Sequence, residues 1–199
     1  MALTIGLTGG IASGKSTISH MLKEFGIPVV DADLIAREVV RVGEEAYKQI
    51  VKEFGSEILQ ENGEINRTKL GAIVFHHEEK RKRLNAIVHP AVRKKMLEQK
   101  EAFLRNGANA VVLDIPLLIE SQLFHLVDKI IVVYVDEAIQ LERLIKRNGL
   151  AKEDAVARIR AQMPLSDKKS YADAVIDNNG TIERTREQLL YILKMWNVL

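Results

Sequence analysis

A glycine-rich stretch near the N-terminus has the residue types of a phosphate-binding loop. Residues 9–16 are GGIASGKS, which matches the pattern G-x4-G-K-[S/T]. Such a loop turns backbone N–H groups toward phosphate oxygens, and the helix that follows adds partial positive charge. The pattern predicts binding of ATP or GTP. Lys15 would reach the β- and γ-phosphates, the Ser16 hydroxyl would coordinate Mg²⁺, and Thr17 would contact the α-phosphate.

Two aspartates follow the next apolar run, in the stretch VVDADLIAREV. Asp33 can accept the proton of an attacking hydroxyl, or orient that hydroxyl in line with the γ-phosphate. Asp33 can also be the N-cap of a helix expected over residues 34–40. A phosphate loop one strand away favours the catalytic interpretation. Asp31 is interpreted as a residue behind the site or as a partner of a metal-bound water.

A third acid follows four apolar residues in AVVLDIPLLIE. Asp114 can hold Mg²⁺ through a water molecule, as acids at strand ends do in phosphoryl-transfer enzymes. The alternative is a turn-forming aspartate before Pro116, and the sequence does not choose between the two. Pro116 and Leu117 would line a substrate cleft or serve only in packing.

Two arginines lie four residues apart in QLERLIKRNGL, on one face of an expected helix. Guanidinium groups on a mobile segment can neutralise the oxygens of a transferring phosphoryl group. The alternative is an exposed helix face on which Arg143 and Arg147 pair with Glu142, Glu153 or Asp154. Their position between two strands favours the functional interpretation.

Two further residues have weaker signals. His89 precedes Pro90 in a basic region, where Pro90 predicts a local break in the helix. His89 either contacts the substrate or is a buried structural histidine, and the structural interpretation is favoured. Asn178 lies in VIDNNG, where amide groups can hydrogen-bond an adenine ring, although a turn of this composition requires no function.

Short apolar runs separated by helical patterns predict the elements that position these residues. Runs without alternation indicate a parallel sheet covered on both faces, and ligands bind at the carboxyl ends of such strands. The predicted strands are Leu3–Leu7, Ile27–Val30, Ala110–Leu113, Lys129–Val135 and Ala174–Ile176. Helical patterns over 46–54, 67–75 and 78–105 predict an insertion, and a charged helical segment over 141–161 has Gly149 near its middle.

Composition restricts the class of protein. The chain has 199 residues, a net charge of +2 and no cysteine, which excludes disulfides, thiol nucleophiles and cysteine-bound zinc. The mild charge and few aromatic residues give no support for nucleic-acid binding. No apolar run approaches the roughly 20 residues of a membrane-spanning helix, so no membrane association and a cytoplasmic location are expected. The rival interpretations are a nucleoside monophosphate kinase, a GTP-dependent switch and a nucleotide-dependent enzyme of nucleic acids. The N/T-K-x-D tetrapeptide typical of guanine recognition does not occur.

The ordered motifs resemble the dephospho-coenzyme A kinase family. The matching stretches are IGLTGGIASGKST, VVDADLIAREV, IVHPAVR, VVLDIPLLIE, QLERLIKRNGL with ARIRAQMP, and VIDNNG, which together span nearly the whole chain. The resemblance implies an α/β fold: a three-layer P-loop core with a parallel sheet, a helical substrate-binding insertion and a lid. It places one such domain over 1–199, with the core at 1–31, 108–138 and 172–199, the CoA-binding subdomain near 32–107 and the lid near 139–171.

The resemblance also implies an activity and a set of site residues. ATP would phosphorylate the 3′-hydroxyl of the dephospho-CoA ribose, with Mg²⁺ as cofactor and with these two substrates as partners. The chain would be a monomer or a small homo-oligomer. Asp33 would be the base, and Arg143 or Arg147 would steady the phosphoryl group. The ATP-binding residues would be Ala12, Ser13, Gly14, Lys15, Ser16 and Thr17, with Asn178 near the adenine.

Overall fold

A computed structural model of the chain describes residues 2–75 and 77–199. Met1 and His76, which fall in the expected core and insertion, lie outside the described residues. The chain divides into two compact units. The first comprises Met1–Val30 with Ala102–Leu199, and the second comprises Asp31–Glu101. The lid expected over 139–171 is therefore part of the first unit.

A five-stranded sheet has the order β2-β3-β1-β4-β5. The strands are β1 (Leu3–Gly9), β2 (Val29–Asp31), β3 (Ala110–Asp114), β4 (Lys129–Tyr134) and β5 (Ala174–Asp177). The pairs β1–β3, β1–β4 and β4–β5 are parallel, with Leu7 opposite Asp114, Gly9 opposite Val133 and Tyr134 opposite Asp177. The five predicted strands and the parallel α/β sheet are confirmed. The register brings the carboxyl ends of these strands to one edge.

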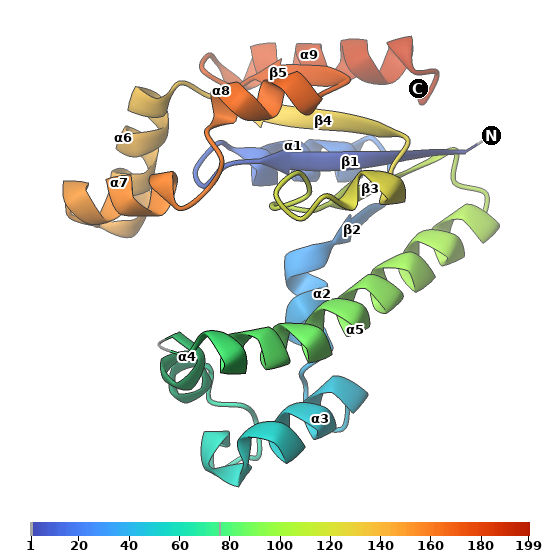
Figure 1. The fold of residues 1–199 in the computed structure, drawn as a ribbon. Coiled ribbons are helices and arrows are strands. Elements are labelled where there is room, and N and C mark those ends of the chain that lie inside the picture. The colour runs from blue at the N-terminus through green and yellow to red at the C-terminus, as the bar shows by residue number, and fades with distance from the viewer. Residues whose placement is uncertain (1, 76) are drawn as a thin grey trace. The chain divides into compact units, whose positions relative to one another are not determined.

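Helices and loops cover both faces of the sheet in the first unit (Figure 1). Helices α1 (Lys15–Glu24) and α9 (Ile182–Met195) cover one face. Their apolar residues form one core with β1, β3, β4 and β5, including Ile5, Leu22, Val112, Ile131 and Leu189. The segment containing η2 (Leu123–Leu126), together with α8 (Leu165–Lys168) and η3 (Lys169–Tyr171), covers the other face.

Helix α1 is terminated by a glycine, the residue type most favoured after a helix C-terminus. Gly26 has a φ of 75°, in the left-handed region. Its N–H donates to Lys23 O and the next N–H, of Ile27, donates to Leu22 O. These two bonds form a Schellman motif, which satisfies carbonyl groups at the end of the helix.

The charged segment expected over 141–161 forms two helices rather than one. Helix α6 (Glu137–Asn148) ends at Gly149, whose φ of 62° is left-handed, and α7 (Lys152–Arg160) begins three residues later. The two helices pack against each other. Gly149 separates them because its backbone leaves the right-handed helical region.

The second unit is helical. It contains α2 (Ala32–Glu38), α3 (Glu45–Phe54), η1 (Ser56–Ile58), α4 (Arg67–Phe75) and most of α5 (Glu78–Arg105). A small core gathers Ile50, Phe54, Ile58, Ile65 and Leu70. No helix in the described part of the chain is both long enough and apolar enough to cross a membrane.

The predicted break at Pro90 is wrong. Helix α5 continues through Pro90 and bends partway along (Figure 1). A proline inside a helix removes one backbone hydrogen bond and usually bends the helix. Leu84 and Val88 pack against the small core before the proline, and Met96 is buried after it. Packing on both sides of Pro90 therefore holds one bent helix together.

Candidate active site

The phosphate loop joins β1 to α1 and has an irregular backbone. Ala12 has a φ of 57° and Gly14 a φ of 88°, so both lie in the left-handed region. The turn is held by Ser13 N–H donating to Gly10 O at 3.1 Å and Thr17 N–H donating to Gly14 O at 3.0 Å. Helix α1 begins at Lys15, so its partially positive N-terminus lies at the loop. The loop thus has the form of a phosphate cradle.

Lys15 is paired with a buried carboxylate. Its ammonium donates to Asp114 Oδ1; Lys15 is the first residue of α1, and Asp114 ends β3, the strand that neighbours β1. Asp114 is 3% exposed and is the last residue of β3. The pair places a cation and an acid side by side beneath the loop. Phosphoryl transfer uses groups of both kinds, a cation for the phosphates and an acid for the metal.

The donor groups at the loop fit a magnesium–nucleotide complex. Ser16 is exposed in the first turn of α1, and Asp114 supplies one carboxylate. Within residues 2–75 and 77–199, no group of three or more histidines, cysteines and acids could hold a metal by itself. Mg²⁺ commonly binds through one or two protein oxygens together with substrate phosphates and water. The residues present therefore fit that metal.

Asn178, which directly follows the outer strand β5, holds the phosphate loop in place. It is buried, its Nδ2 donates to Ser13 O at 2.8 Å, and its Oδ1 accepts from the Thr185 hydroxyl at 2.8 Å. The carboxamide is thus already bonded within the chain. The contact of Asn178 with adenine stays a prediction, and the structure adds a role for this side chain in holding the loop.

Gly14 faces Asn178, and a side chain at position 14 is expected to disrupt the contact of Asn178 with the loop. A Cβ at Gly14 would lie 2.0 Å from Asn178 Nδ2, with a φ that disfavours other residues. We expect Gly14→Ala to weaken ATP binding about tenfold or more, since a buried hydrogen bond and the loop turn are both disturbed. Isothermal titration with MgATP measures this.

Gly63→Ala is the matched control for the Gly14 variant. Gly63 has a similar φ of 82°, but a Cβ there would meet nothing within 4 Å. The control reports the cost of backbone strain alone, about 1–2 kcal/mol, and should leave ATP affinity unchanged. Equal ATP affinity of Gly14→Ala and the parent chain would contradict the assignment of this contact.

The two lid arginines have different surroundings. Arg143 is partly buried, and its Nη2 donates to Asn178 O at 2.9 Å. Arg147 is exposed, and its Nε donates to Asn148 Oδ1 at 2.8 Å. Neither arginine pairs with an acid among the described residues, so the predicted ion pairs with Glu142, Glu153 or Asp154 are not formed. Arg143 alone reaches the residue that clamps the phosphate loop.

Asp31 and Asp33 lie in the second unit. Asp31 is the N-cap of α2, because its Oδ1 accepts from Leu34 N–H at 2.9 Å. The alternative in which Asp33 caps this helix is therefore wrong. Asp33 is exposed in the first turn of α2, and within the described ranges its carboxylate accepts no hydrogen bond. Its carboxylate is thus available to a ligand.

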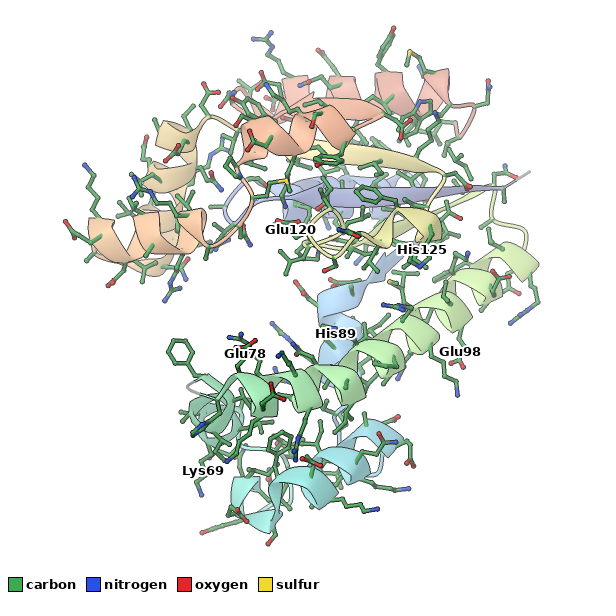
Figure 2. All side chains as sticks on the ribbon, viewed as in Figure 1. Lys69, Glu78, His89, Glu98, Glu120 and His125 are labelled. Atoms are coloured by element: carbon green, nitrogen blue, oxygen red, sulfur yellow. The ribbon has the colours of Figure 1, made fainter. Side chains whose placement is uncertain are left out.

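The remaining predicted substrate contacts differ in exposure. His89 is exposed on α5 (Figure 2), so the interpretation as a buried structural histidine is wrong. It stands one residue after Val88, which packs on the small core, and so lies on another face of the helix. Leu117 is 45% exposed, whereas the carbonyl of Pro116 accepts from the Thr8 hydroxyl at 2.8 Å. Leu117 is thus the more accessible of these two residues.

Sequence reasoning missed two glutamines that hold the loop. Gln140 on α6 donates to Ile11 O at 2.7 Å, and Gln162 after α7 accepts from Ile11 N–H at 2.8 Å. Gln140 is 5% exposed. Glutamine in a charged helix is typical of an exposed face, so no local signal marks either residue. Both lie in the segment expected to be the lid.

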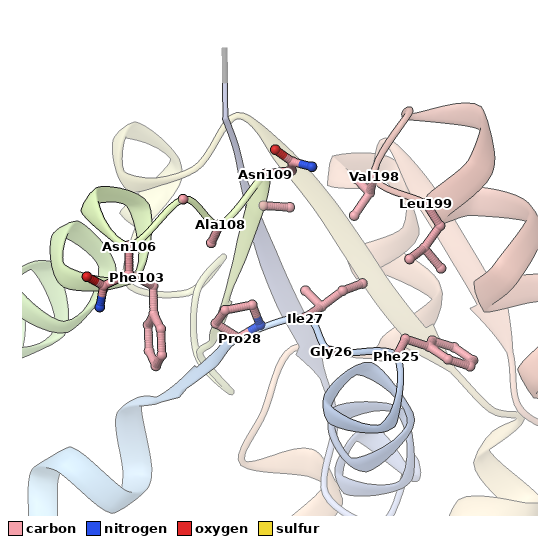
Figure 3. Close-up of a pocket in the computed structure, with 12 residues that line it drawn as sticks. Phe25, Gly26, Ile27, Pro28, Phe103, Asn106, Ala108, Asn109, Val198 and Leu199 are labelled. Carbon is pink, nitrogen blue, oxygen red and sulfur yellow. The ribbon is translucent and has the colours of Figure 1, made fainter.

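Cavities in the described part of the first unit differ in their distance from the loop. One, of about 370 Å³, is lined by residues including Tyr134, Gln140, Gln162 and Leu165, and so lies next to the loop. The Tyr134 hydroxyl donates to Asp136 at 2.7 Å, which raises the pKa of Tyr134. Another, of about 380 Å³ (Figure 3), is lined by Phe25, Pro28, Phe103 and Leu199 among others. It lies where β2 and β3 begin and contains none of the predicted site residues.

Known proteins share this sequence and fold over their full length. The family model described as dephospho-CoA kinase matches residues 3–184. A dephospho-CoA kinase of Geobacillus kaustophilus (strain HTA426) is 67% identical over 199 residues, which cover 100% of this chain and 99% of that protein. A crystal structure from Thermus thermophilus is 33% identical with a TM-score of 0.84, and covers 98% of this chain and 97% of its own.

A solved structure of dephospho-CoA kinase from Campylobacter jejuni is also similar. It is 30% identical with a TM-score of 0.74, and covers 98% of both chains. These findings agree with the resemblance seen in the motifs and give no support to a nucleoside monophosphate kinase, a GTP-dependent switch or an enzyme of nucleic acids. The chain belongs to the dephospho-CoA kinase family.

Proposed function

We propose that this chain transfers the γ-phosphoryl group of ATP to the 3′-hydroxyl of the dephospho-CoA ribose, giving coenzyme A and ADP. ATP-dependent phosphorylation of dephospho-CoA is the activity of its family. The observation that supports the chemistry most directly is the pair of Lys15 and Asp114 beneath the loop at the start of α1. A loop and a lysine of this kind bind nucleotide phosphates.

The phosphate loop and Lys15 hold the donor nucleotide. Backbone N–H groups of residues 12–17 and the N-terminus of α1 would surround the phosphate oxygens. Lys15 would contact the β- and γ-phosphates and thereby offset the charge that spreads over their oxygens during transfer. The pair with Asp114 keeps the ammonium close to the sheet edge until the nucleotide binds.

Ser16 and Asp114 are the residues that would hold Mg²⁺. The Ser16 hydroxyl would coordinate the ion directly, and Asp114 would do so through water. An ion held there would supply positive charge against the negative charge that develops on the phosphate oxygens. Asp114 would thus serve both Lys15 and the metal-bound water.

Asp33 is the group that would activate the acceptor. A carboxylate can orient a ribose hydroxyl and accept its proton as the new P–O bond forms. The exposed position of Asp33 in the first turn of α2 and its lack of a capping role support this assignment. The helical insertion near 32–107, with His89, and the residues Pro116 and Leu117 would bind the rest of dephospho-CoA.

Arg143 is the lid arginine that would steady the transferring phosphoryl group. Its bond to Asn178 O supports this choice over Arg147, because Asn178 also bonds the loop at Ser13. Arg143→Ala is expected to lower kcat about 10³-fold, the lower range for loss of an arginine finger. Arg147→Ala, an exposed arginine one turn away, should change kcat by no more than about twofold. Steady-state kinetics on both variants tests the assignment, and the reverse order of effects would contradict it.

The proposed activity is tested by ADP release from MgATP. The purified chain is assayed alone, with dephospho-CoA, and with AMP and CMP as parallel acceptors. Strong stimulation by dephospho-CoA alone, with coenzyme A as product, is expected. Stimulation by a nucleoside monophosphate would overturn the acceptor, and slow release that ignores every acceptor would overturn the transfer reaction.

A further inference from the structure

Lys168 is a fully buried cation that the proposed reaction does not use. It lies at the end of α8 with 0% exposure, whereas the adjacent Lys169 is exposed. Burial of an ammonium group is strongly unfavourable unless the charge is paired and its N–H groups are bonded. The position of Lys168 in the first unit therefore requires a set of partners.

Three acceptors surround the ammonium of Lys168. Its Nζ lies 2.9 Å from Gly9 O, 3.3 Å from Pro116 O and 2.9 Å from Glu120 Oε1. An ammonium has three N–H donors and no acceptor, so these contacts use its full capacity. Two of the three acceptors are backbone carbonyls, which a lysine that only neutralised Glu120 would not need.

The two carbonyls belong to the segments that lead to Lys15 and follow Asp114, the ion pair at the phosphate loop. Gly9 ends β1 and is the first residue of the phosphate-loop pattern, and its carbonyl shares a rigid peptide plane with the Gly10 N–H. Pro116 follows Asp114 by two residues, and its carbonyl also accepts from the Thr8 hydroxyl at 2.8 Å. Lys168 thus joins the strand end before Lys15 to the strand end at Asp114.

Glu120 supplies the negative charge that balances the Lys168 ammonium. Its Oε1 accepts from Lys168 and, at 3.4 Å, from Met163 N–H. Its Oε2 is buried and accepts no hydrogen bond from the described residues (Figure 2 labels Glu120). Loss of Lys168 would therefore have two separable effects: two carbonyls would lose a donor, and a carboxylate would lose its charge partner.

We propose that Lys168 is a positioning residue for nucleotide binding, which holds the entry of the phosphate loop at Gly9 against the Asp114 segment at Pro116. The inference rests on the proposed function, because it assigns the loop to ATP. Removal of the ammonium frees the Gly9–Gly10 peptide to rotate, so that the N–H groups of the loop no longer converge on the phosphates. The affinity for ATP should fall even where the fold is intact.

Three variants and one control test the proposal. Lys168→Met removes the ammonium, Lys168→Met/Glu120→Gln also removes the unpaired charge, and Glu120→Gln keeps the ammonium on both carbonyls. Lys169→Met is the control, since this neighbouring lysine is exposed and its Nζ lies 4.0 Å from the centre of the Tyr134 ring. Each protein is examined by thermal unfolding, by calorimetric titration with MgATP, and by the KM for dephospho-CoA.

The proposal predicts that ATP affinity depends on the Lys168 ammonium and not on the charge of Glu120. We expect Kd for MgATP to rise about tenfold in both Lys168 variants and to change less than about twofold in Glu120→Gln and Lys169→Met. The double variant should recover melting temperature relative to Lys168→Met, and the KM for dephospho-CoA should stay near that of the parent chain.

Other results of the same measurements would contradict the proposed role of Lys168. ATP affinity restored in the double variant would show that Lys168 serves only to neutralise Glu120. If neither Lys168 variant folds, the test falls to the folded Glu120→Gln protein. A rise of about tenfold in its Kd for MgATP would contradict the proposal, and an unchanged Kd would uphold it. Because the titration needs no acceptor, failure of the chain to phosphorylate dephospho-CoA would be recognised separately in the ADP-release assay.

Discussion

Asp33→Asn is expected to lower kcat with dephospho-CoA by about 10²- to 10⁴-fold, the range for loss of a general base. The amide has nearly the same size but cannot accept the proton of the ribose hydroxyl. The Kd for MgATP should stay close to that of the parent chain, because the phosphate loop is unaltered. Steady-state kinetics and calorimetric titration of the same preparation separate these two quantities.

Glu45→Gln is the matched control for the Asp33 variant. Both acids are exposed in the first turn of a helix in the second unit, α2 for Asp33 and α3 for Glu45. Each loses a similar interaction with its helix N-terminus, about 0.3–1 kcal/mol, so unfolding experiments should show similar small changes. A folded Asp33→Asn protein with undiminished kcat would remove Asp33 from the reaction, and an acceptor phosphate that needs no base would then become the better interpretation.

Lys15→Met is expected to lower kcat/KM for ATP by about 10²- to 10³-fold, the loss associated with one donor to a developing negative charge. The variant should also be less stable. Asp114 is 3% exposed and would lose its lysine, and breaking a buried ion pair from one side costs about 3–5 kcal/mol. Thermal unfolding must therefore accompany the kinetics.

A second variant separates stability from chemistry at this pair. Lys15→Met/Asp114→Asn also removes the buried negative charge that Lys15 balanced, so its melting temperature should exceed that of Lys15→Met while turnover stays low. Lys23→Met serves as the control, because Lys23 is exposed in the last turn of the same helix. Recovery of kcat/KM in the double variant would mean that Lys15 only balances Asp114 and does not act on the nucleotide.

The sequence by itself determined the elements and the edge of the sheet at which the loop lies. The strand, the glycine loop and α1 are adjacent in the chain, so the G-x4-G-K-S pattern and the apolar run before it specify them locally. The five strands were predicted for the same reason, since buried parallel strands are continuous apolar runs. Gly26, directly after the apolar pattern of α1, is a local signal of a helix end because left-handed backbone favours glycine.

Interactions between neighbours in the chain were harder to assign where two residues compete for one role. Asp31 and Asp33 both precede the apolar face of α2, and only the backbone geometry shows that Asp31 is the cap. Likewise Pro90 predicts a break when its missing N–H is considered alone. Packing of Val88 and Met96 on either side keeps α5 continuous, and that packing depends on segments distant in the chain.

Only the tertiary structure decided which side chains are paired and buried. Lys15 meets Asp114 across 99 residues, Lys168 meets Gly9 across 159, and Asn178 meets Ser13 across 165. Nothing in the stretch DKKS distinguishes the buried Lys168 from the exposed Lys169. The charge, donors and length of a lysine are the same in both places. Burial and partners depend on which strands and loops converge, and that convergence is a property of the folded chain.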